Sequence, residues 1–229
     1  QFLNTEGGKT KSNAIEIPSI NLPKGGGAIK GIDEKFTVNA VNGTSSFGIE
    51  LPVGASRGMA PSLTLTYSSG AGNGIFGLGW DLSLSSIKRK TDKGLPQYLD
   101  PQDSDTFLLS DAEDLVPEFQ READQSFSKD LEGNYVYKEQ DSPDGLYRIR
   151  SYRPRIEGLF ARIERWMEKT SGAFKWRVMN KNNSTVLYGW SSNSVIKDPQ
   201  NPHRIYQWLP EFSFDDKGNC CHYQYKPED

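Results

Sequence analysis

The sequence has little cysteine, little histidine and no excess of basic residues. Its 229 residues contain two cysteines, Cys220 and Cys221, which are adjacent and therefore cannot join distant parts of the chain. They supply neither a disulfide framework nor the four spaced ligands of a structural zinc site, and we interpret them as a reduced pair on a strand. Lys and Arg number 27 against 30 Asp and Glu, a net charge of -3. This balance argues against a nucleic-acid or anionic-membrane binder, and no apolar run approaches the ~20 residues of a membrane helix.

The ends of the sequence suggest a piece of a longer protein. Residues 1–4 lack the basic-then-apolar layout of a signal peptide and contain no initiator Met. Residues 226–229 follow directly after a strand-like run. We therefore expect further chain in the whole protein.

Residues 1–34 are polar and rich in Gly and Pro, so they have little to bury. We predict a flexible, extended N-terminal arm over this range. We also hypothesise that the arm, with its glycines at 25–27, lies over another sheet.

Period-two alternation starts at Phe36 and predicts an all-β domain over residues 35–229. Turn signals such as Asn42-Gly43 and Asp144-Gly145 separate the short strands, as in antiparallel meanders and hairpins. The fold is then sandwich-like or part of a larger Rhs-like shell, and its aromatic residues must supply much of the core. The expected strands cover residues 36–40, 49–53, 63–67, 80–85, 135–137, 146–150, 159–166, 174–178, 185–188, 204–208 and 222–225.

Residues 100–133 are acidic and irregular, and we interpret them as a surface excursion between two β regions. Within them only residues 106–109 look like a strand, and residues 118–129 could hold a short helix.

Two glycine motifs resemble phosphate-binding loops without their context. Residues 72–77 fit G-x-G-x-x-G, but a strand-like run follows where a helix is required, so we favour a glycine-rich β-turn packed under Trp80. Residues 8–10 read Gly-Lys-Thr, but Leu3 occupies the position of the first glycine of that loop.

Catalytic and metal-binding patterns are weak. His203, in a turn, and His222, on the last strand, are the only imidazoles, and no G-x-S-x-G motif presents a nucleophile. Asp100, Asp103 and Asp105 could collect Ca²⁺, but a solvated acidic loop is the simpler interpretation. Residues 88–90, Lys-Arg-Lys, are expected to be a solvated turn. We therefore assign no catalytic, cofactor-binding or metal-binding residue.

One stretch is more specific. Residues 51–80 resemble the opening domain of the SpvB family, shared by Salmonella plasmid virulence protein B and the TcB (TcaC-type) component of insecticidal toxin complexes. Residues 22–27, 87–98, 152–166 and 186–189 are similar to the same family in the same order. Residues 216–225 look like a Tyr-rich hairpin of the Rhs (YD) repeat kind.

The resemblance implies a structural role. In toxin-complex members such a region begins a β-sheet shell that, with the TcC partner, encloses a toxic polypeptide, and a propeller that docks on TcA follows later. In Salmonella-type members it precedes an actin ADP-ribosyltransferase, which needs Ser-Thr-Ser and a Glu-x-Glu or Gln-x-Glu pair. Only Gln120 and Glu122 match that pair and Ser-Thr-Ser is absent, so the transferase is expected outside this segment.

We therefore predict a non-enzymatic structural domain of a bacterial toxin, secreted without a recognisable signal peptide in this segment. Its expected partners are the rest of its own polypeptide and the toxin-complex C and A components, without nucleic acid, cofactor or membrane insertion. Unpaired strand edges would be covered by neighbouring segments. The alternative is a glycan- or protein-binding β-sandwich of an adhesin, with exposed Trp190 and Trp208 stacking on sugars. An enzyme fragment is a third hypothesis, which detectable NAD hydrolysis would support.

Overall fold

The computed structural model describes residues 35–38, 44–54, 60–74, 76–110, 113–155 and 161–226. The arm predicted for residues 1–34 and the turn predicted at residues 42–43 lie outside these ranges. Side chains are described from residue 44 onward.

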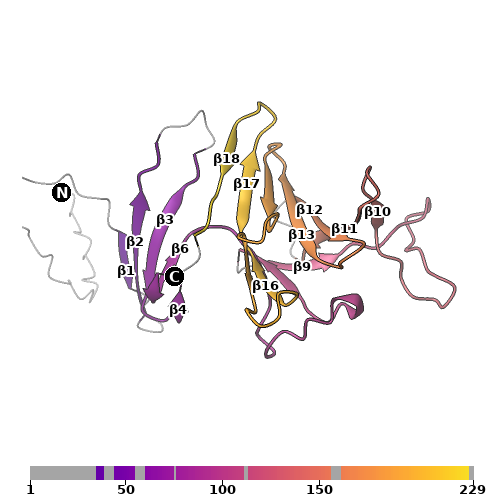
Figure 1. Ribbon diagram of the computed structural model, residues 1–229, viewed down its shortest axis with the longest axis horizontal. Coiled ribbons are helices and arrows are strands. Elements are labelled where there is room, and N and C mark those ends of the chain that lie inside the picture. Colours follow the sequence, from indigo (N-terminus) through magenta and orange to yellow (C-terminus); the bar gives the residue numbers. More distant parts are fainter. Residues whose placement is uncertain are drawn as a thin grey trace, which may run out of the picture.

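Antiparallel strands make up almost all of the regular structure, which confirms the predicted all-β class. A four-stranded sheet in the order β1-β2-β3-β6 lies beside a twelve-stranded sheet, and β4 pairs with β5 (Figure 1). The strands outside the large sheet are β1 (Lys35–Val38), β2 (Ser45–Leu51), β3 (Leu63–Ser68), β4 (Asn73–Gly74), β5 (Gly77–Leu78) and β6 (Trp80–Leu82).

The large sheet has the order β15-β16-β7-β8-β9-β11-β12-β13-β14-β17-β18, with β10 paired to β11. Its strands are β7 (Ile87–Arg89), β8 (Phe107–Leu109), β9 (Glu113–Pro117), β10 (Glu139–Asp141), β11 (Tyr147–Pro154), β12 (Ala161–Glu168), β13 (Phe174–Asn180), β14 (Thr185–Tyr188), β15 (Val195–Lys197), β16 (Ile205–Trp208), β17 (Pro210–Phe214) and β18 (Cys220–His222).

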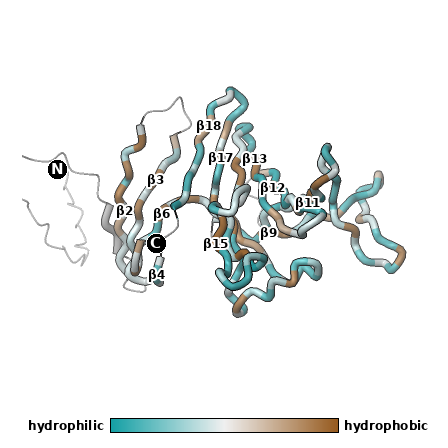
Figure 2. The backbone as a smooth tube through the Cα atoms, viewed as in Figure 1, coloured by the Kyte–Doolittle hydropathy of each residue, from teal (hydrophilic) through white to brown (hydrophobic). Residues whose placement is uncertain are grey.

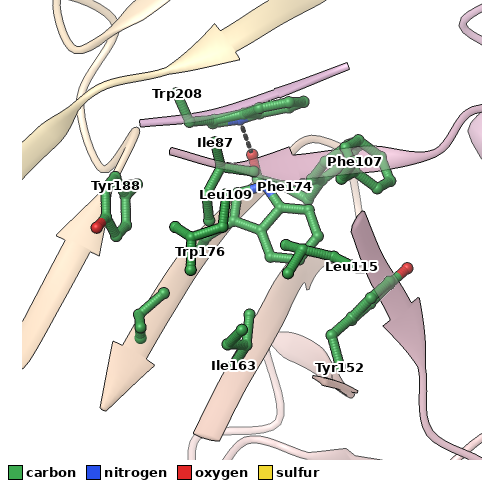
Figure 3. Packing of buried hydrophobic residues seen from close by; sticks show 11 residues of the cluster. Ile87, Phe107, Leu109, Leu115, Tyr152, Ile163, Phe174, Trp176, Tyr188 and Trp208 are labelled. Carbon is green, nitrogen blue, oxygen red and sulfur yellow. Dashed lines mark hydrogen bonds between the residues drawn. The ribbon is translucent and has the colours of Figure 1, made fainter. Parts of the chain in front are cut away.

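The large sheet is curled, and Trp208 on β16 connects two strands that are far apart in the strand order. β16 is second and β13 eighth in the strand order, yet the Trp208 indole N–H donates to the Phe174 carbonyl on β13 at 2.9 Å (Figure 3). The two rings also stack, with centroids 4.8 Å apart. A single residue, Leu209, then leads the chain from β16 to β17 near the opposite edge of the sheet.

The hydrophobic core fills the inside of this curl. On β13, Phe174, Trp176 and Val178 are buried, whereas the intervening Lys175 and Arg177 point to the outer face, as period-two alternation requires. Phe107 from β8 makes edge-on contacts with four rings of the core, at centroid distances from 5.0 to 6.4 Å. The buried apolar residues are Ile87, Phe107, Leu109, Leu115, Tyr152, Ile163, Phe174, Trp176, Val178, Tyr188 and Trp208.

The stretch interpreted as an acidic excursion contributes to this core. The strand predicted at residues 106–109 is β8. The next strand, β9, was not predicted, and its Leu115 is buried. The short helix expected at residues 118–129 is wrong, because these residues form isolated β-bridges such as Phe119 with Tyr137 and Arg121 with Phe127. Residues 135–137, expected as a strand, likewise form only isolated bridges.

Candidate interaction surface

One face of the small sheet is apolar over most of β2, β3 and β6. Antiparallel register aligns Phe47 with Tyr67 and Tyr67 with Trp80. Two residues further along each strand, Ile49, Leu65 and Leu82 are aligned in the same way. Because residues two apart share a face of a strand, these side chains form one surface. This surface, called the apolar face below, consists of Phe47, Ile49, Leu51, Leu63, Leu65, Tyr67, Trp80 and Leu82.

The apolar face is incompletely buried. Trp80 lies 6.4 Å from Phe47 and 5.2 Å from Tyr67 between ring centroids, so the aromatic residues pack on each other. Every described residue of the apolar face is half-buried or exposed, and Leu51 retains 37% of its surface. Figure 2 shows brown, apolar positions along β2 and β3. A sheet normally buries its apolar face against a second layer, so this face has the character of an interaction surface.

The opposite face of the same sheet is polar. Thr64, Thr66 and Asp81 alternate with the apolar residues, and the Thr66 hydroxyl donates to the Asp81 carbonyl at 3.2 Å. The small sheet therefore has one face suited to water and one suited to a protein partner.

The G-x-G-x-x-G pattern at residues 72–77 forms a hairpin of β4 and β5, as predicted, and β6 follows it in place of a helix. Gly77 has a φ of +101°, and a Cβ on Gly74 would lie 2.1 Å from the Trp80 carbonyl oxygen. These glycines are required by backbone geometry and close packing next to the apolar face. The Gly-Lys-Thr run at residues 8–10 lies outside the described residues.

The basic trio at residues 88–90 is not a solvated turn. Arg89 lies on β7 and is only 1% exposed. Its guanidinium donates to Asp100 at 2.6 and 2.9 Å and to Asp105 at 2.7 Å, and its Nε donates to the Ile205 carbonyl at 2.8 Å. Two carboxylates and a carbonyl thus compensate a cation that is buried inside the sheet.

The remaining acidic residue of this loop, Asp103, faces a different arginine. Its carboxylate accepts two hydrogen bonds from Arg150, at 2.7 and 2.8 Å, while Glu139 binds the Arg150 Nε at 2.6 Å. Burial alone would lower the pKa of Arg150, but the Asp103 and Glu139 carboxylates raise it above its ordinary value.

Both interpretations of Asp100, Asp103 and Asp105 are therefore wrong. They form neither a solvated loop nor a calcium site, because arginines already neutralise them. Within the described ranges, no group of three or more His, Cys, Asp or Glu could hold a metal ion.

The two histidines lie where the sequence predicts. His203 is in the turn before β16, and His222 lies on β18 with its ring stacked 4.4 Å from that of Phe212. Cys220 and Cys221 lie together on β18, the strand position that the sequence predicts, and both are free cysteines.

The tryptophans do not form the exposed sugar platform of the alternative hypothesis. Trp208 is fully buried, so its expected exposure is wrong. Trp190 is half-buried, and its indole N–H donates to the Trp176 carbonyl at 3.2 Å. The Lys175 ammonium lies 3.8 Å from the centroid of the Trp190 ring, so this ring face is already occupied.

Gln120 and Glu122 flank Arg121 in the bridge-forming segment after β9. The Arg121 guanidinium donates to the Gln125 carbonyl at 2.8 Å and lies over the Phe127 ring. In the described part of the chain, no helix is long and apolar enough to cross a membrane.

Comparison with known proteins agrees with this architecture. Residues 39–229 match the family described as SpvB, Salmonella virulence plasmid 65kDa B protein. The mono(ADP-ribosyl)transferase SpvB of Salmonella typhimurium is 36% identical over 211 residues. That match covers 90% of this chain and 32% of the relative, so the chain spans about a third of the length of the curated relatives it matches.

Solved structures give the same result. A chain in the crystal structure of TcdB2-TccC3 is 36% identical with a TM-score of 0.69, over 94% of this chain and 10% of that chain. A chain of the Photorhabdus luminescens Tc holotoxin pore has a TM-score of 0.70 at 36% identity, over 93% of this chain and 9% of that chain. The N-terminal domain of the effector protein SpvB from Salmonella typhimurium strain LT2 has a TM-score of 0.63 at 35% identity, over 80% of this chain and 54% of that chain.

Proposed function

The chain belongs to the SpvB family, and on this premise we propose that it is a non-enzymatic structural domain of a longer bacterial toxin. In this proposal it contributes antiparallel sheet to a shell that holds or delivers a toxic polypeptide. The similarity to a chain of TcdB2-TccC3 supports this role, because the similar region there is a tenth of a much longer chain.

The apolar face of the small sheet carries the proposal. The large sheet encloses its own core, whereas no described residue of the apolar face is fully buried. A second protein layer over this face would remove its apolar surface from water. In a shell wall, the apolar face of one segment of sheet would be covered by the next segment.

The proposed partners follow from the same argument. The rest of the chain's own polypeptide is the first candidate for the covering layer, and subunits of the toxin-complex C and A type would complete the assembly. We propose that the assembled protein acts outside the producing cell.

The transferase activity of the Salmonella relatives is proposed to lie outside this segment. The chain spans only about a third of those relatives. In addition, the residue between Gln120 and Glu122, Arg121, packs on Phe127, so the middle position of this Gln-x-Glu match has a structural contact.

A pair of matched substitutions in the full-length protein tests the proposal. Leu65→Glu places a charge on the apolar face, and Thr66→Glu places the same charge on the polar face of the same strand. The full-length protein is captured from its source with an antibody against this segment, and its native mass and co-purifying chains are measured.

The expected wild-type result is a mass several times 25.7 kDa with partner chains present. Leu65→Glu is expected to lower the yield of the assembly, and Thr66→Glu is expected to preserve it. Equal yields from both variants, or a native protein of 25.7 kDa, would contradict the shell role.

A further inference from the structure

A second surface lies at the end of β9, where the chain runs on through residues 118–121. Between β9 and β10 the chain projects from the large sheet on the side away from the small sheet (Figure 1). A groove of about 830 Å³ lies at the base of this projection. Its lining residues are Val116, Pro117, Glu118, Phe119, Gln120, Arg121, Phe127, Lys138, Arg153 and Arg155.

The groove combines apolar surface with a surplus of positive charge. Its apolar contribution comes from Val116, Pro117, Phe119 and Phe127. Four of the lining side chains are cationic and one, Glu118, is a carboxylate, in a chain whose net charge is -3. The surplus is therefore local, and it is opposite in sign to the charge of the chain as a whole.

Internal ion pairs neutralise only part of this charge. Lys138 pairs with Glu118 at 2.9 Å, and Arg155 lies 3.3 Å from Asp114, which Lys90 approaches more closely at 2.8 Å. Arg155 keeps 68% of its side-chain surface.

Among the described residues, no carboxylate pairs with the remaining two cations, Arg121 and Arg153. Arg121 donates one hydrogen bond to a backbone carbonyl, and its guanidinium lies 4.4 Å from the centroid of the Phe127 ring. Arg153 is exposed. Arginine offers five N–H donors in a planar fork, so both side chains can bind carboxylates.

From this combination we propose that the groove binds an extended polypeptide segment in which acidic and apolar side chains alternate. The carboxylates would face the arginines, and the apolar side chains would contact Phe119 and Phe127. The volume lies within the ~300–1,000 Å³ that is usual for ligand sites. The inference rests on the groove alone and is independent of the shell role.

Nucleic acid is the disfavoured occupant. Phosphate backbones bind proteins through several cations along an extended basic surface. Here Glu118 lines the groove, and two of its four cations are already paired with carboxylates of this chain.

The test measures binding of a fluorescein-labelled peptide of alternating glutamate and valine to the full 229-residue chain by fluorescence anisotropy. The first variant, Arg153→Glu with Arg155→Glu, reverses two groove charges, and a milder variant places Gln at both positions. The matched control, Lys181→Glu with Lys197→Glu, reverses two exposed charges elsewhere. Near-ultraviolet circular dichroism confirms that each variant is folded.

The proposal predicts saturable binding that falls about tenfold in the Glu variant, falls less in the Gln variant and is unchanged in the control. A peptide with lysine in place of glutamate is expected not to bind. Absence of binding, or equal binding by the groove variants and the control, would overturn the proposal. Tighter binding of a single-stranded oligothymidylate than of the peptide would overturn it in favour of nucleic acid.

Discussion

Replacing Arg89 with Met is expected to destabilise the large sheet strongly. The substitution keeps an unbranched side chain but removes the charge and four hydrogen bonds, three of them to Asp100 and Asp105. Asp105 is 6% exposed and would keep its charge without its cation. Breaking one partner out of a buried ion pair costs about 3–5 kcal/mol, and we expect a loss of this size in the free energy of unfolding. It would be a large part of the 5–15 kcal/mol typical of a whole domain.

Urea unfolding followed by tryptophan fluorescence measures this loss, because Trp208 lies 5.6 Å from the Arg89 guanidinium. Arg148→Met is the matched control, since Arg148 is 52% exposed and lies 3.8 Å from Glu139. For this exposed pair we expect a loss of about 0–1 kcal/mol. If the Arg89 and Arg148 variants unfold at the same urea concentration, the Arg89 cluster does not stabilise the curl and the reasoning fails.

Three further predictions concern stability. Deleting residues 1–34 should lower the melting temperature if the arm covers a sheet, and an unchanged value would refute that hypothesis. Gly189→Ala should cost about 2–4 kcal/mol in urea unfolding, because its φ is +68° and the new Cβ would lie 2.3 Å from Trp208. Gly145 has a φ of +72° and no atom within 4 Å of a new Cβ, so Gly145→Ala should lower the free energy of unfolding by only about 1 kcal/mol. Equal losses in the Gly189 and Gly145 variants would contradict the expected clash with Trp208. Burial raises the pKa of Tyr188 from 10.0 to about 12. Because the pKa of Tyr188 is higher in the folded than in the unfolded protein, the free energy of unfolding should fall as pH rises from about 10 to 12. The Tyr188→Phe variant should lose less stability over this range. Identical dependence of stability on pH in the two proteins would refute the prediction.

Much of the strand content could be predicted from alternation, because side-chain period is a local property. The apolar positions of β3 and β6 follow from it, as do Ile49 and Leu51 of β2, whereas Phe47 lies before the strand expected at residues 49–53. The pairing of these strands into one apolar face could not be predicted from the sequence. Nor could the incomplete burial of that face, because both depend on residues far apart in the chain.

The missed elements have identifiable causes. β9 begins with two acidic residues and ends in Pro117, a composition that is typical of a loop. Its pairing with β8 and β11 makes it a strand. Arg89 lies between two lysines, a pattern that predicts a solvent-exposed side chain. Its burial depends on carboxylates 11 and 16 residues away and on rings from β13 and β16.

The segment expected as a helix shows the same dependence on distant contacts. Phe119 stacks on Tyr137, with centroids 5.3 Å apart and an interplanar angle of 13°. Cross-strand contacts of this kind are invisible to a periodicity count within residues 118–129, and they favour the extended backbone.

Oxidative footprinting of Trp80 and Tyr67, in the full-length native protein and in the 229-residue chain, tests whether another layer covers the apolar face. Both residues lie on the apolar face and are half-buried in the described structure. We expect strong protection of both side chains in the full-length protein, because another layer is proposed to cover the apolar face there. Trp208, which is fully buried in the described structure, is the internal reference. Equal oxidation of Trp80 and Tyr67 in the two proteins would show that nothing covers this face, and the shell role would be contradicted.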